Sequence, residues 1–184
     1  MEKISTFLSV GKPHNNMQQN YVDNLVKYLD NKNIIAETLG TTFYSNKSPL
    51  IPIQEKMQEV NGAIILAMER FHSKEGIYRE GSDEQEKFED QYFATVWTQI
   101  EGAMAYQLGL PLLILKEKKL IAEGMFDPEI HEWKVTNIDS SNPEELFKNP
   151  IKSQIDVWIQ DVQKYHKLKQ KSNNYSQNGP VMIK

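Results

Sequence analysis

Cysteine is absent from the 184 residues of the chain. Its absence excludes disulfides, thiolate zinc sites, iron–sulfur ligation and cysteine nucleophiles, and it is typical of a reducing compartment. A basic surplus is missing as well, because 21 Lys and Arg face 25 Asp and Glu, a formal net charge of −4. Little positive charge is therefore left over to neutralise a phosphate backbone, and nucleic acid is not an expected partner.

Long apolar runs are also absent. The longest, residues 62–68, falls far short of the ~20 residues that a membrane helix needs, so no membrane association is expected. The first residues lack the apolar stretch and cleavage site of a secretion signal. These features together predict a cytoplasmic protein.

The chain does contain enough apolar material for a core, at 39% apolar and 10% aromatic residues. Its length suits one domain of roughly 150 residues with a tail. We predict a single domain over 1–169 that ends in a helix. Residues 170–184 are mostly Asn, Gln, Ser and Lys, and we predict that they are disordered.

Short apolar runs at 4–10, 62–68 and 112–115 are separated by segments with helical spacing, a rhythm that predicts a parallel sheet. Residues 34–39 predict a weaker strand at an edge, and 131–138 a fifth strand. The predicted helices lie around 21–29 and at 51–60, 93–108 and 151–169, with a helical turn at 143–148. The fold class is therefore α/β, an open, doubly wound parallel sheet of about five strands with helices on both faces.

Ligands of such sheets bind beyond the carboxyl ends of the strands, which directs attention to the loop 9–16. Ser9 and Gly11 precede a predicted helix N-terminus and leave room for a phosphate or ribose. The loop matches neither a G-x-G-x-x-G fingerprint nor a P-loop, and an ordinary strand-to-helix turn is the alternative.

The connection 69–91 is much longer than the ~2–6 residues usual between a strand and a helix. We predict a lid or binding loop in which Arg70, Phe71 and Tyr78 are the candidate ligand contacts. The acidic cluster 83–90 is interpreted separately, as a solvated insertion.

The segment 93–108 predicts the strongest helix of the chain, with one apolar face composed of Phe93, Trp97, Ile100, Met104 and Leu108. Glu101 lies one turn after Trp97, and the small residue Gly102 follows it, so the helix can approach the sheet closely. Partial burial would raise the pKa of Glu101 and make it a base or a nucleophile toward a sugar carbon. A glutamate on the helix surface is the alternative.

The stretch 96–114, Val-Trp-Thr-Gln-Ile-Glu-Gly-Ala-Met-Ala-Tyr-Gln-Leu-Gly-Leu-Pro-Leu-Leu-Ile, resembles two related groups. One is the Toll/interleukin-1 receptor (TIR) domain, in which a tryptophan precedes a helical glutamate, followed by proline and a strand. The other is the nucleoside 2-deoxyribosyltransferase group, with its Thr-x-x-Glu helix and Gly-x-Pro. The opening 6–9, Thr-Phe-Leu-Ser, is also similar to the TIR start, and the resemblance spans roughly 4–138.

The resemblance implies a flavodoxin-like sheet and cleavage of an N-glycosidic bond. For a TIR-like enzyme the substrate is NAD, which is hydrolysed or cyclised to an ADP-ribose product, and Glu101 is the catalytic carboxylate. Matching positions imply a substrate-binding set of Phe7, Ser9, Gly11, Met68, Arg70, Phe71, Trp97 and Thr98. NAD is then a substrate and no cofactor is expected. No metal is expected either, since His14, His72, His131 and His166 lack helical metal-pair spacing.

The sequence departs from both groups. Thr95 and Thr98 are the nearest analogues of the serine or cysteine of the TIR groove, and Met68-Glu69 stands where the transferases carry an aspartate that grips the base. Three hypotheses follow: an NAD-cleaving enzyme of bacterial signalling or antiphage defence, a deoxyribosyltransferase-like N-glycosidase, and a non-catalytic nucleotide sensor or adaptor.

Assembly is the last expectation from the sequence. The resemblance implies a homo-oligomer and a downstream effector that senses the product. Trp158 and Tyr165 lie near one stripe of the last predicted helix, where they either pack on their own domain or dock a second subunit.

Overall fold

The structure is a computed structural model that describes residues 3–129 and 133–177. Seven strands, four α-helices and two short 3₁₀ helices make up the described chain. The strands are β1 (Ile4–Val10), β2 (Ile34–Glu37), β3 (Ala63–Ala67), β4 (Phe71–Tyr78), β5 (Glu86–Phe93), β6 (Leu112–Glu117) and β7 (Val135–Ile138). The helices are α1 (Asn16–Asp30), α2 (Leu50–Glu59), α3 (Val96–Gln107), η1 (Gly124–Phe126), η2 (Pro143–Phe147) and α4 (Ile151–Gln177).

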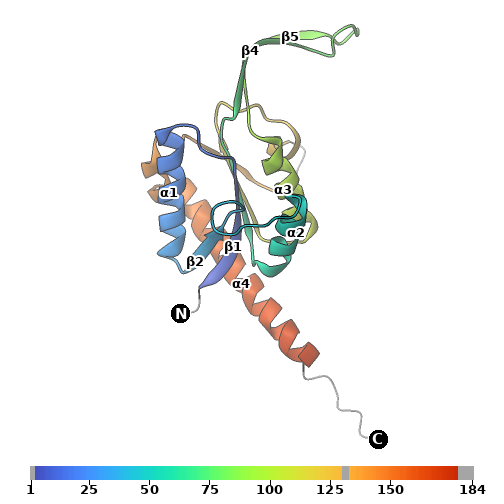
Figure 1. Cartoon of the computed structure of the whole chain (residues 1–184). Coiled ribbons are helices and arrows are strands. Elements are labelled where there is room, and N and C mark those ends of the chain that lie inside the picture. Colours follow the sequence, from blue (N-terminus) through green and yellow to red (C-terminus); the bar gives the residue numbers. More distant parts are fainter. Residues whose placement is uncertain (1–2, 130–132, 178–184) are drawn as a thin grey trace, which may run out of the picture.

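Five strands form one parallel sheet in the order β2-β1-β3-β6-β7, which confirms the predicted α/β class and is consistent with a flavodoxin-like open sheet. β2 lies at an edge, as its weak pattern predicts. α1 and α4 cover one face of the sheet, and α2 and α3 cover the other (Figure 1). The order reverses at β1, so β1 and β3 border the place where such sheets bind ligands.

The core follows the alternation of side chains along the strands. Leu8, Ile64 and Leu66 face α1 and α4, where they pack with Tyr21 and Trp158. On the other face, Phe7 and Ala63 pack with Ile53, Met57 and Ala105 of α2 and α3. Both faces of the central strands are therefore buried, which explains why β3 is apolar throughout.

Helix α4 packs closely against the sheet at Gly62. A Cβ at this position would lie 2.6 Å from a methyl carbon of Val162. Trp158 is buried in the same region, and its indole N–H donates to the carbonyl of Pro111 at 3.0 Å. Tyr165 is half-buried and packs against the core of the α2–α3 face. Of the two interpretations of the aromatic stripe, packing within the domain is confirmed, and docking of a second subunit through Trp158 is wrong.

The predicted loop 69–91 is instead a β-hairpin, β4–β5, that projects away from the sheet (Figure 1). The amide of Arg70 donates to the carbonyl of Phe93 at 2.8 Å and closes the base of the hairpin. The amide of Ile121 donates to the carbonyl of Tyr92 at 3.0 Å and ties this base to the body. The predicted acidic insertion 83–90 forms the tip and much of β5, and all of it except half-buried Phe88 is exposed.

Two other boundaries differ from the prediction. Phe93 belongs to β5 and not to the helix, because Thr95 caps α3 and its side chain accepts from the amide of Trp97 at 3.4 Å. Helix α4 continues past Lys169 to Gln177, so 170–177 is not a disordered tail, and the remainder of that prediction lies outside the described residues. The fifth strand begins at Val135, and part of its predicted range also lies outside them. No helix of the described residues is both long and apolar enough to span a bilayer.

Candidate functional site

The first turns of α3 place its polar side chains against the end of β1. Thr95 is the N-cap, and the hydroxyl of Thr98 donates to the Thr95 carbonyl at 2.6 Å. The buried residues of α3 are Thr98, Glu101, Gly102 and Ala105. The face that carries Glu101 therefore points toward the sheet.

Close packing accounts for this orientation. A Cβ on Gly102 would lie 2.7 Å from the sulfur of Met125 and 3.3 Å from a side-chain carbon of Ile65. Only a residue without a side chain allows this approach. The predicted apolar face of α3 is consequently wrong: Trp97, Ile100 and Leu108 are each 40% exposed.

Glu101 is buried, and little in its surroundings compensates its charge. It is 9% exposed, and no salt bridge of the described residues involves it. Burial raises the pKa of Glu101 above its ordinary value, and the nearby hydroxyl of Ser9 opposes this by lowering it. The predicted burial of this carboxyl group, and the direction of its pKa, are both confirmed.

Ser9 is the second buried polar group of the site. It is 1% exposed, and its Oγ has no partner at normal hydrogen-bond geometry in the described part of the chain. Such a hydroxyl costs about 1–3 kcal/mol of stability. Two residues further along, Gly11 packs on Thr95, and a Cβ there would lie 3.3 Å from the Thr95 methyl carbon. The loop that follows β1 is therefore in contact with the cap of α3.

The structure brings only part of the predicted substrate-binding set to Glu101. Ser9, Gly11 and Thr98 lie at the junction of β1 and α3. Phe7 is on the same face of β1 but is a core residue, with its ring 6.3 Å from that of Phe43. Met68 packs in the core between the sheet and α1 and α4, so its assignment to the site of Glu101 is wrong.

The remaining predicted contacts are on the surface. Trp97 is 40% exposed and Phe71 is 60% exposed. Phe71 is the first residue of β4, next to the exposed Arg70, and its ring lies 5.9 Å from that of Phe93 at the base of the hairpin. Phe71 therefore borders the base of the hairpin, and Trp97 lies on the exposed side of α3.

Two cavities flank the junction. One, of about 290 Å³, lies at the base of the hairpin and is lined by Phe71, Phe93, Ala94, Val96, Gln99, Ile121, Glu123 and Phe126. A larger groove of about 810 Å³ begins at Gly11 and runs between α1 and the loop after β2, where Thr38 and Thr41 line it. Glu101 lines neither cavity, so it is closed off from both in this conformation.

A second polar cluster, which the sequence analysis did not identify, lies at the carboxyl ends of β3 and β6. Glu117 is 3% exposed, accepts from the amide of Glu69 at 2.5 Å and also accepts from Ser140. The Glu69 carboxylate forms an ion pair with Lys119. The only sequence signal was the charged run 116–119, which directly follows an apolar strand.

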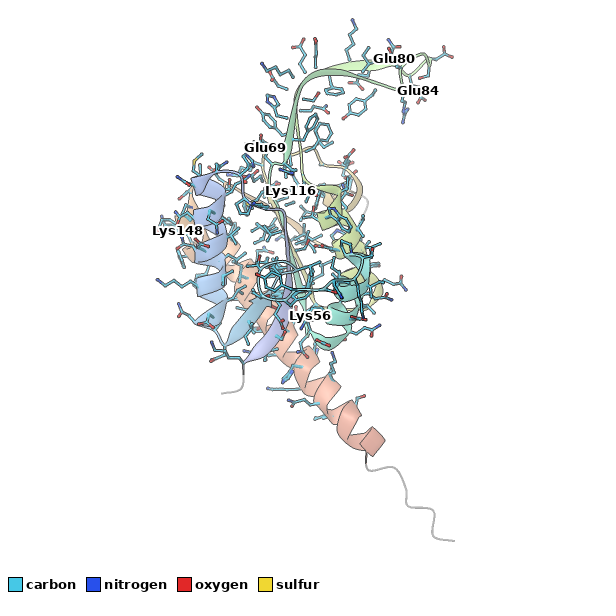
Figure 2. The ribbon with its side chains drawn as sticks, viewed as in Figure 1. Lys56, Glu69, Glu80, Glu84, Lys116 and Lys148 are labelled. Carbon is cyan, nitrogen blue, oxygen red and sulfur yellow. The ribbon has the colours of Figure 1, made fainter. Side chains whose placement is uncertain are left out.

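Lys116 belongs to the same strand end, close to Glu69 at the base of the hairpin (Figure 2). It is 4% exposed, and its ammonium group donates to the carbonyls of Leu120 at 2.8 Å and Glu117 at 3.1 Å. Burial lowers the pKa of Lys116. The hydrogen bonds of Lys116 hold the turn after β6, and Glu117 and Lys119 hold Glu69. We therefore infer that the cluster supports the base of the hairpin.

No group of three or more metal-ligating side chains converges among the described residues. His14, His72 and His166 lie apart, on the β1–α1 loop, the hairpin and α4, and His131 is outside the described residues. A scan against protein-family models finds no matching family, and a search of curated proteins finds no match. The resemblance to TIR domains and deoxyribosyltransferases therefore stays a prediction.

Proposed function

We propose that this chain cleaves an N-glycosidic bond in a nucleotide, with NAD as the substrate and Glu101 as the catalytic carboxylate. The observation that carries the proposal is that Glu101 is buried beside the hydroxyl of Ser9 and has no ion-pair partner among the described residues. Both lie where β1 ends, next to the reversal of strand order. Buried groups that cost stability are typical of functional sites.

The chemistry requires one well-placed carboxylate. Departure of nicotinamide leaves a ribose with the character of an oxocarbenium ion, which an adjacent carboxylate stabilises electrostatically or traps covalently. A carboxylate acts more strongly on such a cation in surroundings of low dielectric constant. Glu101 is buried and therefore in surroundings of low dielectric constant. In the proposal, the Ser9 hydroxyl bonds either a ribose hydroxyl or the carboxylate of Glu101.

Access is the second element of the proposal. Because Glu101 lines neither flanking cavity, the proposal requires the β1–α1 loop, which contacts the cap of α3 at Gly11, to move away before a sugar reaches Glu101. The groove at Gly11 and Lys12 would then hold the remainder of the nucleotide. In this proposal water or an internal nucleophile completes the reaction, which gives the hydrolysed or the cyclised product. Assembly of copies and a downstream effector, in bacterial signalling or antiphage defence, rest on the resemblance alone.

One observation favours NAD over a deoxynucleoside. A transferase of that group grips the base with an acidic residue after the third strand, and Glu69 is the only acid at this position. Its carboxylate is engaged by Lys119 and its amide by Glu117. Glu69 is therefore poorly suited to holding a base.

The test is incubation of the purified chain with NAD and, separately, with deoxynucleosides, with products identified by mass. We expect nicotinamide release that Glu101→Gln abolishes. Asp161→Asn is the matched control, because Asp161 is an exposed carboxylate on α4 that makes no ion pair among the described residues. Release of free base from deoxynucleosides would select the transferase class. Thermal stabilisation by NAD without turnover would select a sensor, and equal turnover by Glu101→Gln would refute the assignment.

A further inference from the structure

The hairpin β4–β5 lies outside the main sheet, and most of its length packs against no other element of the described chain. A two-stranded ribbon is marginally stable in water unless it packs against something else. Beyond its base, the side chains of this ribbon are exposed or half-buried. Ile77 is 41% exposed and Tyr78 is 36% exposed, so apolar surface remains uncovered near the tip.

The ribbon also places two like charges opposite one another. Glu75 pairs directly with Glu89 across the two strands, an arrangement that destabilises a hairpin. No lysine or arginine of the described residues forms an ion pair with either carboxylate. The ribbon is therefore suited to receive a cation from outside.

A concavity lies at the same place. Glu75, Gly76, Ile77, Lys87, Phe88 and Glu89 line a cavity of about 410 Å³. Side chains alternate along each strand, so Ile77 lies on the same face of the ribbon as Glu75 and Glu89, whereas the Phe88 ring covers Gly76 on the opposite face. On the face of Glu75 and Glu89 the cavity thus combines the exposed Ile77 with two carboxylates and one lysine. We call it the hairpin groove.

The occupant that fits this chemistry is found at the other end of the same chain. Residues 163–172 of α4 contain four lysines and no acid, whereas residues 71–93 contain seven acids against three basic residues. Leu168 is 57% exposed in the centre of this basic segment. Lys164 and Lys171 lie four residues before it and three after it, so the three share one helix face. We call Lys164, Leu168 and Lys171 the basic knob.

The basic knob lies on the outer side of α4, because other residues hold the inner side. Lys169 donates to the carbonyls of Gln58, Glu59 and Val60 at the end of α2, and His166 contacts Asn61 at 3.1 Å. In the described part of the chain, neither Lys164 nor Lys171 forms an ion pair. The knob is therefore firmly positioned and unpaired.

We propose that the hairpin groove of one copy binds the basic knob of a second copy, with Leu168 against Ile77 and the two lysines beside Glu75 and Glu89. The hairpin and the end of α4 lie at opposite ends of the molecule (Figure 1), so they cannot meet within one chain. The contact is head-to-tail and generates a ring or an open filament. Since the inference uses no residue of the proposed active site, it stands whether or not Glu101 is catalytic.

The test is the sedimentation of the full chain and its variants over a range of protein and salt concentrations. We expect wild type to associate at low salt and to dissociate as salt screens the charges. Glu75→Lys with Glu89→Lys, the hairpin variant, and Lys164→Glu with Lys171→Glu, the knob variant, should each be monomeric. Lys148→Glu and Glu144→Lys change the charge at exposed positions elsewhere and should associate as wild type does.

The single variants separate this contact from a symmetric one. If the contact were between two hairpins, the knob variant would still associate as wild type does, and if it were between two knobs, the hairpin variant would. In the proposed arrangement, opposite charges face each other again when the two variants are mixed, since a reversed groove meets a reversed knob. We therefore expect the mixture to form assemblies that neither variant forms alone. A monomeric wild type at all concentrations, or association that the variants leave unchanged, would overturn the proposal.

Discussion

Replacing Ser9 with alanine is expected to stabilise the fold while it impairs the proposed reaction. The Ser9 hydroxyl is buried and has no partner at normal hydrogen-bond geometry among the described residues. Alanine removes one atom and leaves no large cavity, so the unfavourable burial of the hydroxyl is relieved. We expect a gain of about 1 kcal/mol at pH values where Glu101 is protonated, because the hydroxyl stabilises the carboxylate only in its ionised form. For a chain of this size that gain raises Tm by about 2–4 °C.

The same substitution is expected to impair the proposed reaction through its effect on the pKa of Glu101. The Ser9 hydroxyl lowers the pKa of Glu101, so its removal lets burial raise that pKa further. A smaller fraction of Glu101 is then ionised near neutral pH. The pH profile of nicotinamide release should shift to higher pH in Ser9→Ala, in addition to any loss of contact with the ribose.

Thr136→Val is the matched control. Thr136 carries the other buried hydroxyl without a partner in the described residues, on β7 and away from the site. The substitution Thr136→Val should stabilise the fold to a similar extent and leave nicotinamide release unchanged. Thermal unfolding followed by circular dichroism, together with the pH profile of release, makes the comparison. If Ser9→Ala lowers Tm, the hydroxyl has a stabilising partner and the reasoning is refuted.

Three further predictions concern burial and packing. Burial raises the pKa of Glu101 above the ordinary value of 4.5, so its contribution to stability is greatest below that pH and is lost as pH rises through the folded-state pKa. Glu101→Gln should therefore gain stability over wild type in urea titrations as pH rises above 4.5, and a constant difference would contradict this. Gly62→Ala should destabilise by about 1–3 kcal/mol through overpacking against Val162, and an unchanged denaturation midpoint would contradict the close approach. Lys169→Met leaves the carbonyls at the end of α2 without their donor and should lower the midpoint by about 1 kcal/mol, whereas Lys148→Met should not.

The parallel sheet was predictable from the sequence because its signals are local. Buried central strands read as short apolar runs, and the weaker pattern of β2 matches its place at an edge. The position of Glu101 was also predictable, since small residues beside a carboxylate allow a helix to pack tightly.

The face of α3 and the hairpin were not predictable in the same way. The pattern of large residues indicates a face with Trp97 and Ile100, but the close approach at Gly102 turns the small residues inward. The hairpin segment carries alternating charges and lacks a two-residue turn signal, so its sequence predicts a loop. Neither feature can be recognised until the neighbouring elements are placed.

The attachment of the hairpin has a mechanical consequence for the candidate site. Only Ala94 and Thr95 separate β5 from α3, and Thr95 is both the helix cap and the residue that Gly11 packs against. A force applied to the hairpin arm is therefore transmitted to the cap of α3 and to its contact with Gly11. The proposed docking at the distant tip would act on the candidate site through this two-residue connection.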